Sequence, residues 1–338
     1  MLYGIHFIIK KYGIQETKVF EGTEIIEDAT AEKVCYNNRY TIFELERSFD
    51  MIEKNTENPL VSVITICFNP GNSLIKTMES VLAQSFAGFE YVIQDGESAD
   101  DTADLIEGYQ ERFMEKGITL RYFREKDGGI YDAMNKAVAH ANGVWVSFMN
   151  AGDCFYSAGV LNDIFGERDY PNTAILYGDA VEQEYGRYYM FRKAIDQIEA
   201  RMPFSHQSSF TRRELLMRMP FRTDYGIGAD YDFLLTIHQK GFYFTDTGTI
   251  VCIVSKDGLS SLKLYDTFQE TVVIRERHGI HQYNEKQMKR KIRELKLKQF
   301  VMDYFPKWIK KLIRKVQLTV RGQNAALTVP DWERRERC

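Results

Sequence analysis

Three acidic residues follow three successive strands that the sequence predicts, and each has a glycine close by. Asp95 follows the apolar run FEYVIQ, Asp127 follows ITLRYFRE, and Asp153 follows VWVSFM. Ligands of parallel α/β sheets bind beyond the carboxyl ends of the strands. Each acid could instead cap the next helix, but capping does not require a nearby glycine, whereas close approach of a ligand to the backbone does. We therefore expect the three acids to line one ligand site.

The chemistry expected of such a site is metal-assisted binding of a nucleotide diphosphate. Carboxylates alone would repel a diphosphate, and Mg²⁺ or Mn²⁺ resolves the conflict because it binds through one or two carboxylates plus substrate phosphates. The turn after the first strand reads FNPGNS. It is neither a G-x-G-x-x-G turn nor a Walker A loop, which argues against a dinucleotide-binding fold and a P-loop.

The elements that must position these acids alternate between strand and helix. Strands are predicted at 60–68, 89–94, 118–125 and 144–149, and helices at 73–84, 101–115 and 130–141. This alternation indicates right-handed βαβ units and a mostly parallel sheet flanked by helices. Beyond residue 156 we expect a hairpin (AILYGDAVEQ with RYYMFRKA), a helix opening at HQSSFTRRELLMR, a helix ADYDFLLTIHQKG and a closing strand pair FYFTDTGTIVCIV.

The ordered set of motifs resembles the family 2 glycosyltransferases with the GT-A fold. The motifs are VSVITICFN, SVLAQSFAGFEYVIQDGESADDT and EKDGGIYDAMNKAVAHANGVWVSFMNAGDCFY, and HQSSF and GADYDFLL extend the match to about residue 260. The resemblance implies an α/β GT-A domain over 59–262, with a nucleotide-sugar donor half at 59–156 and an acceptor half at 157–262. An N-terminal extension of unknown role (1–58) and a helical, basic tail (263–338) complete the predicted organisation.

The resemblance implies a role for each donor-side residue. Asp95 matches the acid that hydrogen-bonds the pyrimidine base, in a pocket lined by the strand around Ile66 and Phe68. Further positions match the turn beside the nucleotide and sugar and polar residues on the following helix: Asp127, Gly129, Asp132 and Asn135.

The implied metal ligand is Asp153, the final acid of a DxD-type motif that holds Mg²⁺ or Mn²⁺ on the diphosphate. The family often has three acids in D-x-D-D spacing, whereas this chain reads Asn150-Ala151-Gly152-Asp153. Asn150 can still offer a carbonyl ligand or hydrogen-bond the ribose or diphosphate. The departure predicts weaker metal affinity than in relatives and leaves strict metal dependence open.

The acceptor side is expected to hold the catalytic base. Asp230, in GADYDF, matches the acid that takes the proton from the acceptor hydroxyl in a single inverting displacement, and Asp232 is a candidate neighbour for it. Asp230 could instead cap the helix that begins near Tyr231. His206 and Asp179 are further candidates for acceptor contact, although a single histidine is usually structural.

Composition places the chain among ordinary globular proteins. Of its 338 residues 44% are hydrophobic and 27% charged. The five cysteines are scattered without a C-x-x-C pair, which argues against a disulfide framework and a zinc site and fits a reducing compartment. We find no signal peptide and no apolar stretch of about 20 residues. These features predict a cytoplasmic protein, either soluble or peripheral on the inner face of the membrane.

The C-terminal region is strongly basic although the chain carries a net charge of −4. Residues 286–321 carry +11, which leaves −15 for the rest. Residues 304–320 read YFPKWIKKLIRKVQLTV, with apolar and basic side chains on opposite helical faces. This pattern is typical of an interfacial helix that meets an anionic membrane, or of a helix packed on the domain with solvated lysines. No recognised nucleic-acid-binding fold accompanies the charge, so nucleic acid is not an expected partner.

The resulting prediction is an inverting glycosyltransferase. It would move a sugar from a nucleotide-diphosphate sugar, UDP-linked by expectation, to a hydroxyl of a glycan or lipid-linked acceptor in cell-surface polysaccharide synthesis. A nucleotidyltransferase is the nearest enzymatic alternative, but FNPGNS lacks the Gly-rich loop bearing Arg or Lys that it needs. A non-catalytic nucleotide-sugar-binding protein is the other; Asp153 and Asp230 argue against it, and the reduced acidic motif argues slightly for it.

Overall fold

The computed structural model describes residues 58–184, 187–255, 263–306 and 308–309. The predicted N-terminal extension and most of the basic segment 304–320 lie outside these residues. None of the helices within the described ranges is both long and apolar enough to cross a bilayer.

The first half of the central sheet consists of four parallel strands in the order β3-β2-β1-β4. They are β1 (Val61–Cys67), β2 (Phe89–Asp95), β3 (Thr119–Arg124) and β4 (Trp145–Phe148). Every residue of β1, β2 and β4 is buried, as expected for strands covered by helices on both faces. The predicted βαβ units are confirmed, and the carboxyl ends of these strands share one edge of the sheet.

The second half of the sheet is mixed. Antiparallel β8 (Ser209–Arg212) joins β4 to β6 (Thr173–Glu184), and β9 (Tyr243–Ser255) runs parallel to β6. Antiparallel β5 (Cys154–Phe155) closes the sheet on β9. β7 (Arg187–Phe191) pairs with β6 in the predicted hairpin, which is therefore confirmed.

Two local predictions in this half are wrong. HQSSFTRRELLMR does not open a helix: it begins with a 3₁₀ turn, η2 (His206–Ser208), continues as β8, and becomes helical only in α7 (Arg213–Arg218). All four residues of β8 are buried between two neighbouring strands, so burial decides the structure there. FYFTDTGTIVCIV is a single strand, because Gly248 (φ +72°) lies at an irregularity in the pairing of β9 with β6 and not in a reversing turn.

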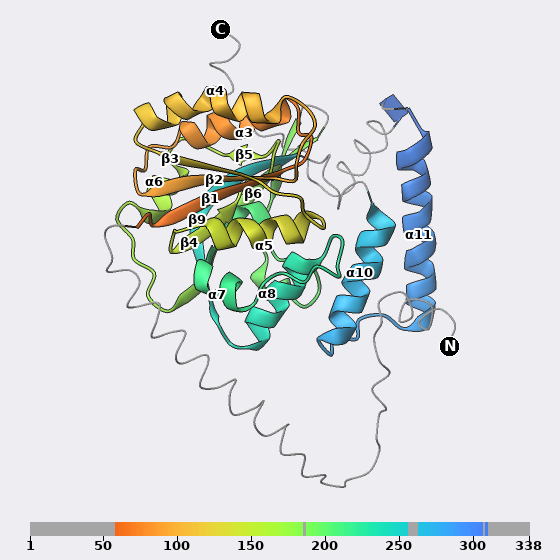
Figure 1. The fold of residues 1–338 in the computed structure, drawn as a ribbon. Coiled ribbons are helices and arrows are strands. Elements are labelled where there is room, and N and C mark those ends of the chain that lie inside the picture. Colours follow the sequence, from red (N-terminus) through yellow and green to blue (C-terminus); the bar gives the residue numbers. More distant parts are fainter. Residues whose placement is uncertain (1–57, 185–186, 256–262, 307, 310–338) are drawn as a thin grey trace.

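Helices cover both faces of the sheet (Figure 1). One face carries α3 (Ser73–Leu82), α4 (Thr102–Glu115) and α6 (Val160–Phe165). The other face carries α5 (Ile130–His140), α7 and α8 (Ala229–Gln239). Two separate apolar clusters fill the two interfaces. The arrangement presents the loops after β1 to β4 at one edge, together with the N-terminal end of α8.

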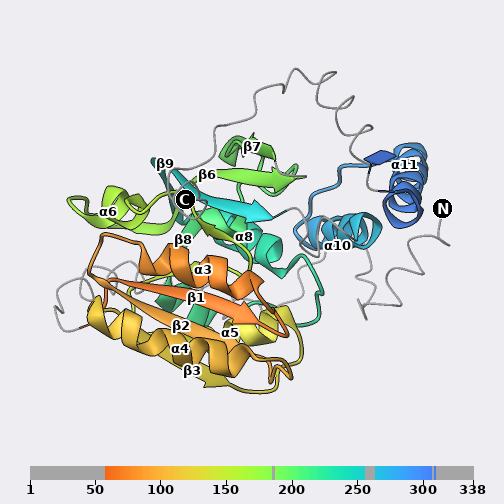
Figure 2. The same ribbon diagram turned by 90° about the horizontal axis from the view of Figure 1, so that it is seen from above.

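Two further helices follow the sheet. α10 (Leu264–Arg277) lies beside α8, and its Val273 and Ile274 are buried in the same core cluster as α5 and α8. α11 (Glu285–Tyr304) lies on the outer side of α10, away from the sheet (Figure 2). The segment predicted as a helical tail therefore begins with a helix that shares the core of the catalytic body.

Candidate active site

The turn that follows β4 carries the predicted metal ligand. Residues 150–153 form a tight turn in which the Asp153 N–H donates to the Asn150 carbonyl over 2.9 Å. Thr77 of α3 fixes it, because its Oγ1 donates to the Asp153 carbonyl over 2.7 Å and accepts the Gly152 N–H over 2.9 Å. Gly152 has φ +98°, a conformation that other residues adopt only with strain. This geometry accounts for the glycine at position 152.

Asp153 is a buried carboxylate held by two donors. Its Oδ1 accepts the Ser255 N–H over 2.9 Å, and its Oδ2 accepts Nε2 of Gln207 over 3.0 Å. Burial raises the pKa of Asp153 to about 6, against the opposing effect of these two hydrogen bonds and the charge of Lys76. Asn150 lies in the same turn, and its buried Oδ1 finds no hydrogen-bond partner within the described residues.

The predicted base pocket lies at the ends of β1 and β2. Asp95 is fully buried: its Oδ1 accepts both the N–H and the hydroxyl of Ser98, and its Oδ2 accepts the Tyr122 hydroxyl over 2.8 Å. Ile66 is buried in the core below the pocket, whereas the Phe68 ring is 65% exposed at its mouth. The structure thus pairs a fixed carboxylate with an open aromatic face, the combination that suits a planar base.

Asp127 joins this pocket from the loop after β3. A side chain at Gly96, directly after Asp95, would collide with the Asp127 carboxylate and touch the Phe68 ring at 3.4 Å. Because Gly96 has no side chain, the loops after β1, β2 and β3 can lie against one another there. Oδ1 of Asp127 also accepts the Gly129 N–H over 2.9 Å.

The other two donor-side predictions lie on α5 and are engaged in contacts of their own. Asp132 accepts the Gly128 N–H over 2.8 Å and pairs with Lys136 at 2.9 Å, so it shapes the loop. Both halves of the Asn135 amide bond the backbone of Phe221, at 2.8 and 2.9 Å. Asn135 therefore fastens α5 to the loop before α8.

Asp230, the predicted base, lies in the first turn of α8. Its Oδ1 accepts the Tyr231 N–H over 2.9 Å and lies 3.0 Å from the Tyr131 hydroxyl of α5. Burial, and next the Asp230 charge, raise the pKa of Tyr131 well above its usual value, so this phenol keeps its proton. Among the described residues, every hydrogen bond to the Asp230 side chain is accepted by Oδ1 and none by Oδ2.

His206 lies between the acidic turn and the base. Its ring stacks on Phe148, with centroids 5.1 Å apart, and its buried Nε2 has no hydrogen-bond partner among the described residues. Burial lowers the pKa of His206, although the nearby charge of Asp230 opposes the shift. The imidazole is therefore neutral near pH 7, and the adjacent Gln207 holds Asp153.

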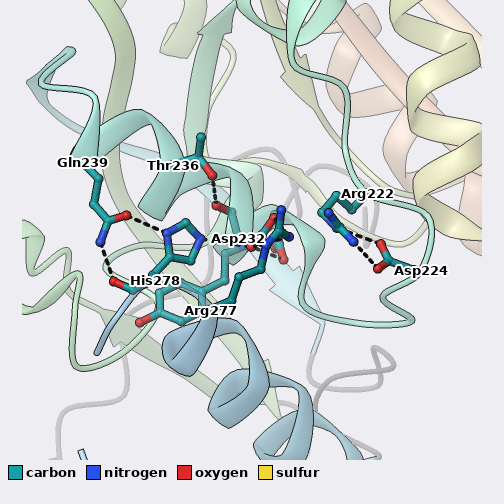
Figure 3. Close-up of polar contacts among 9 residues, drawn as sticks. Arg222, Asp224, Asp232, Thr236, Gln239, Arg277 and His278 are labelled. Atoms are coloured by element: carbon teal, nitrogen blue, oxygen red, sulfur yellow. Dashed lines mark hydrogen bonds and ion pairs between the residues drawn. The ribbon is translucent and has the colours of Figure 1, made fainter. Parts of the chain in front are cut away.

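Asp232 does not neighbour Asp230 in the way the sequence suggested. Residues two apart in a helix face different sides. Asp232 accepts a hydrogen bond from Nε2 of His278 over 3.0 Å and forms an ion pair with Arg277 at 3.3 Å. Both partners lie at the end of α10 (Figure 3). The ring of His278 also contacts Gln239, at 2.7 Å. Asp232 thus anchors α10 on α8.

None of the recorded contacts of Asp179 is with another candidate residue. It is buried in β6, where its Oδ1 accepts the Lys193 N–H over 2.9 Å and its Oδ2 pairs with Arg192 at 3.3 Å. These contacts fix the irregular segment that follows β7, and an acceptor role for Asp179 stays a prediction.

Sequence reasoning passed over three residues of this site. Tyr131 stands inside the quoted motif GGIYDAMNK, and Gln207 stands beside His206, so both carried a positional signal. Glu270 carried none, because its partners lie more than 40 residues away in the chain: its carboxylate accepts the N–H groups of residues 226–228.

A sequence model of the family described as glycosyl transferase family 2 matches residues 62–225. An uncharacterized glycosyltransferase of Mycobacterium tuberculosis is 33% identical over 196 residues, which cover 53% of this chain and 69% of that protein. A PGL/p-HBAD biosynthesis glycosyltransferase of Mycobacterium bovis is 30% identical over 179 residues, covering 52% and 68%.

Solved structures show the same fold at low sequence identity. Staphylococcus aureus TarS in complex with UDP-GlcNAc aligns with a TM-score of 0.52 at 17% identity, over 69% of this chain and 70% of that one. The mannosyltransferase PcManGT of Pyrobaculum calidifontis, in complex with GDP-Man and Mn²⁺, aligns with a TM-score of 0.51 at 16% identity, over 88% of each. The predicted GT-A fold is confirmed.

Proposed function

Because the chain belongs to glycosyltransferase family 2, we propose that it moves a sugar from a UDP-sugar to a hydroxyl of a glycan or lipid-linked acceptor, with inversion, in cell-surface polysaccharide synthesis. One observation carries the proposal. Two adjacent residues of η2 lie near the two carboxylates assigned to the reaction: Gln207 bonds Asp153, and the charge of Asp230 acts on the pKa of His206.

The donor class is supported by the base pocket and by named relatives. The exposed Phe68 side chain offers a stacking face, and the Asp95 carboxylate is fixed at the end of β2 by Ser98 and Tyr122. TarS was solved with UDP-GlcNAc, and a relative from Bacillus subtilis that aligns with 28% of this chain carries the name putative teichuronic acid biosynthesis glycosyltransferase. UDP-sugar and polysaccharide are therefore the expected donor and product classes.

A divalent cation fits the residues of the acidic turn. No group of three or more His, Cys, Asp or Glu that could hold a metal occurs within the described ranges, so few ligands come from these residues. Asp153 with the unpartnered Oδ1 of Asn150 matches a cation whose other ligands are phosphate oxygens. When bound, Mg²⁺ or Mn²⁺ would neutralise charge on the diphosphate leaving group.

The remaining chemistry falls to Asp230. Its Oδ2 accepts the proton of the acceptor hydroxyl as the acceptor oxygen bonds to the anomeric carbon. The bond from that carbon to the diphosphate breaks, and UDP leaves with the electron pair. Tyr131 holds Oδ1 at 3.0 Å, which orients the other oxygen toward the acceptor.

The test compares Asp230→Asn with the parent chain on UDP-glucose, UDP-galactose and UDP-N-acetylglucosamine, with and without Mn²⁺. We expect UDP release to fall about 100-fold or more, while the affinity for UDP measured by calorimetry stays within about twofold. Asp224→Asn, an exposed surface acid, is the matched control. Near-full activity of the Asp230→Asn variant would sink the proposal, and so would a parent chain that binds UDP and turns over none of the donors.

We also propose that the basic C-terminal region places the enzyme on an anionic membrane surface, where a lipid-linked acceptor is found. α11 supports this proposal, because its side turned from the body exposes the large apolar residues Leu297, Phe300 and Tyr304. Exposed Arg290 and Arg293 lie on the same side at helical spacing. Basic and aromatic residues together suit an interface with anionic lipid.

A further inference from the structure

We propose that Glu270 of α10 is a positioning residue for Asp230, so that α10 is part of the acid–base machinery. The inference rests on the proposed role of Asp230 as general base. α10 lies beyond residues 62–225, the part of the chain that the family's sequence model matches. The family resemblance therefore assigns it no part in the reaction.

The Glu270 carboxylate binds three consecutive backbone N–H groups. Its Oε1 accepts from Gly226 over 2.9 Å, and its Oε2 accepts from Ile227 over 2.8 Å and from Gly228 over 3.0 Å. Glu270 is only 5% exposed, so these N–H groups replace the water that its charge would otherwise require. Consecutive amides that converge on an anion form a strong and geometrically exacting site.

These three amides lead directly into the helix of the base. Gly228 is the N-cap of α8, and Asp230 is its second residue. A negative charge near a helix N-terminus is stabilised by the helix dipole, and the unpaired amides there need acceptors. Glu270 brings its charge to this end from another helix and accepts the N–H of the N-cap residue Gly228, while its other two partners, Gly226 and Ile227, directly precede the helix.

Glycine at the N-cap is what lets α10 come this close. A side chain at Gly228 would meet Cδ1 of Ile274 at 2.7 Å, and one at Gly226 would meet Oε1 of Glu270 at 3.3 Å. Both glycines thus allow the backbone to contact α10 directly. The close approach fixes the loop against a rigid element.

The backbone of Ile227 links Glu270 to the base. Its N–H is held by Glu270, and its carbonyl accepts a hydrogen bond from the Tyr131 hydroxyl. The same hydroxyl lies 3.0 Å from Oδ1 of Asp230. Loss of Glu270 releases the N–H of Ile227, so the backbone beside Asp230 can shift. A shift of about 1 Å in a reacting group can cost about 100-fold in rate.

A second attachment of α10 gives a matched structural control. His278 contacts Asp232 at 3.0 Å on another side of α8, and none of its recorded contacts involves the loop before Asp230 (Figure 3). A variant at His278 loosens α10 without touching residues 226–228. It therefore separates the fastening of α10 from the positioning of the base.

The experiment measures UDP release from the most active of three donors, UDP-glucose, UDP-galactose and UDP-N-acetylglucosamine. The full-length variants are Glu270→Gln, Glu270→Ala, His278→Ala, Asp230→Asn and the double variant Asp230→Asn/Glu270→Ala. We expect kcat to fall about 100-fold in Glu270→Ala and less in Glu270→Gln, which keeps one acceptor oxygen. The KM for donor and the affinity for UDP should stay within about twofold, and His278→Ala should keep its kcat within about threefold.

The double variant tests whether Glu270 acts through Asp230. A residue that works only through the base adds no further loss once the base is gone, so the double variant should match Asp230→Asn within about threefold. Amide hydrogen exchange gives a readout independent of turnover. Compared with the parent chain, Glu270→Ala should exchange as many as three more amide hydrogens over residues 226–228, because Glu270 binds these three amides.

Any of four results would overturn the inference. They are a normal kcat in Glu270→Ala, full additivity in the double variant, unchanged protection of residues 226–228, or equal losses of kcat and UDP affinity in Glu270→Ala. An Asp230→Asn variant that keeps its activity would instead overturn the proposed function. An inactive Asp230→Asn beside a Glu270→Ala with normal kcat would remove only the positioning role.

Discussion

The side-chain amide of Gln207 donates to Oδ2 of Asp153 over 3.0 Å, which couples the 3₁₀ turn before β8 to the acidic turn after β4. The bond opposes the effect of burial, which raises the pKa of Asp153 to about 6. The carboxylate of the acidic turn is therefore poised to gain a proton just below neutral pH.

Binding of Mn²⁺ together with UDP should depend on pH through Asp153. The ionised form predominates above pH 6 and the protonated form below it, so affinity should fall as the pH decreases from 7 to 5. Gln207→Ala removes a donor to the carboxylate and should move this decline to higher pH. Calorimetry across this range checks both, with exposed Gln197→Ala as control; a decline that does not move in Gln207→Ala contradicts the assignment.

Phe68→Ala should weaken UDP binding and leave stability unchanged. The ring is 65% exposed, so its removal costs the core little, whereas base stacking on an aromatic ring is worth about 1–3 kcal/mol. We expect UDP affinity to fall roughly 10-fold with a shift in Tm below about 2 °C. Tyr243→Ala, a 64% exposed aromatic at the start of β9, is the control. Equal affinities in the two variants would remove Phe68 from the base pocket.

Tyr131→Phe should lower both turnover and stability. The buried hydroxyl has one proton to share between the Ile227 carbonyl and Oδ1 of Asp230, and its loss removes a donor from this pair, although Oδ1 keeps the Tyr231 N–H. An unsatisfied buried group costs about 1–3 kcal/mol, and we expect kcat to fall about 10-fold with unchanged UDP affinity. Steady-state kinetics and urea unfolding measure the two effects. A variant that is destabilised yet keeps its kcat would show that Tyr131 serves the fold alone.

Removal of residues 304–338 should weaken binding to anionic vesicles, because it removes the predicted interfacial segment and leaves only the exposed side of α11. Co-sedimentation with phosphatidylglycerol vesicles at low and high salt gives the measurement, and phosphatidylcholine vesicles are the control. A basic, aromatic surface binds the first and not the second, and salt weakens the binding. Equal sedimentation of the full-length and shortened chains would contradict membrane docking.

The donor half could be predicted from the sequence because its pattern is local. Apolar runs, turn residues and helical spacing alternate with short connections, so the strand ends that carry Asp95, Asp127 and Asp153 can be placed from sequence order alone. The structure confirms the parallel βαβ units, and its strand order, β3-β2-β1-β4, brings these loops to one edge.

The acceptor half could not be predicted as well, because long-range pairing shapes it. β8 is four residues long, and burial between β4 and β6 outweighs its helical surroundings. The partners of Asn135 and Glu270 lie 86 and more than 40 residues away, and periodicity carries no information at those separations. Asp232 shows the same limit: proximity in sequence to Asp230 suggested a partnership that helix geometry prevents.

The glycine at the N-cap of α8 has a consequence for how specificity diversifies. The base is held by Tyr131 from one helix and faces a loop fastened by Glu270 from another, and neither belongs to the stretch 187–204 around β7. That stretch is nevertheless bonded to the same unit, because the Ile198 carbonyl accepts the Tyr231 hydroxyl of α8 and the Ala200 carbonyl accepts the Arg275 guanidinium of α10. A graft of 187–204 from a relative should therefore keep its fold only if α8 and α10 are transferred with it.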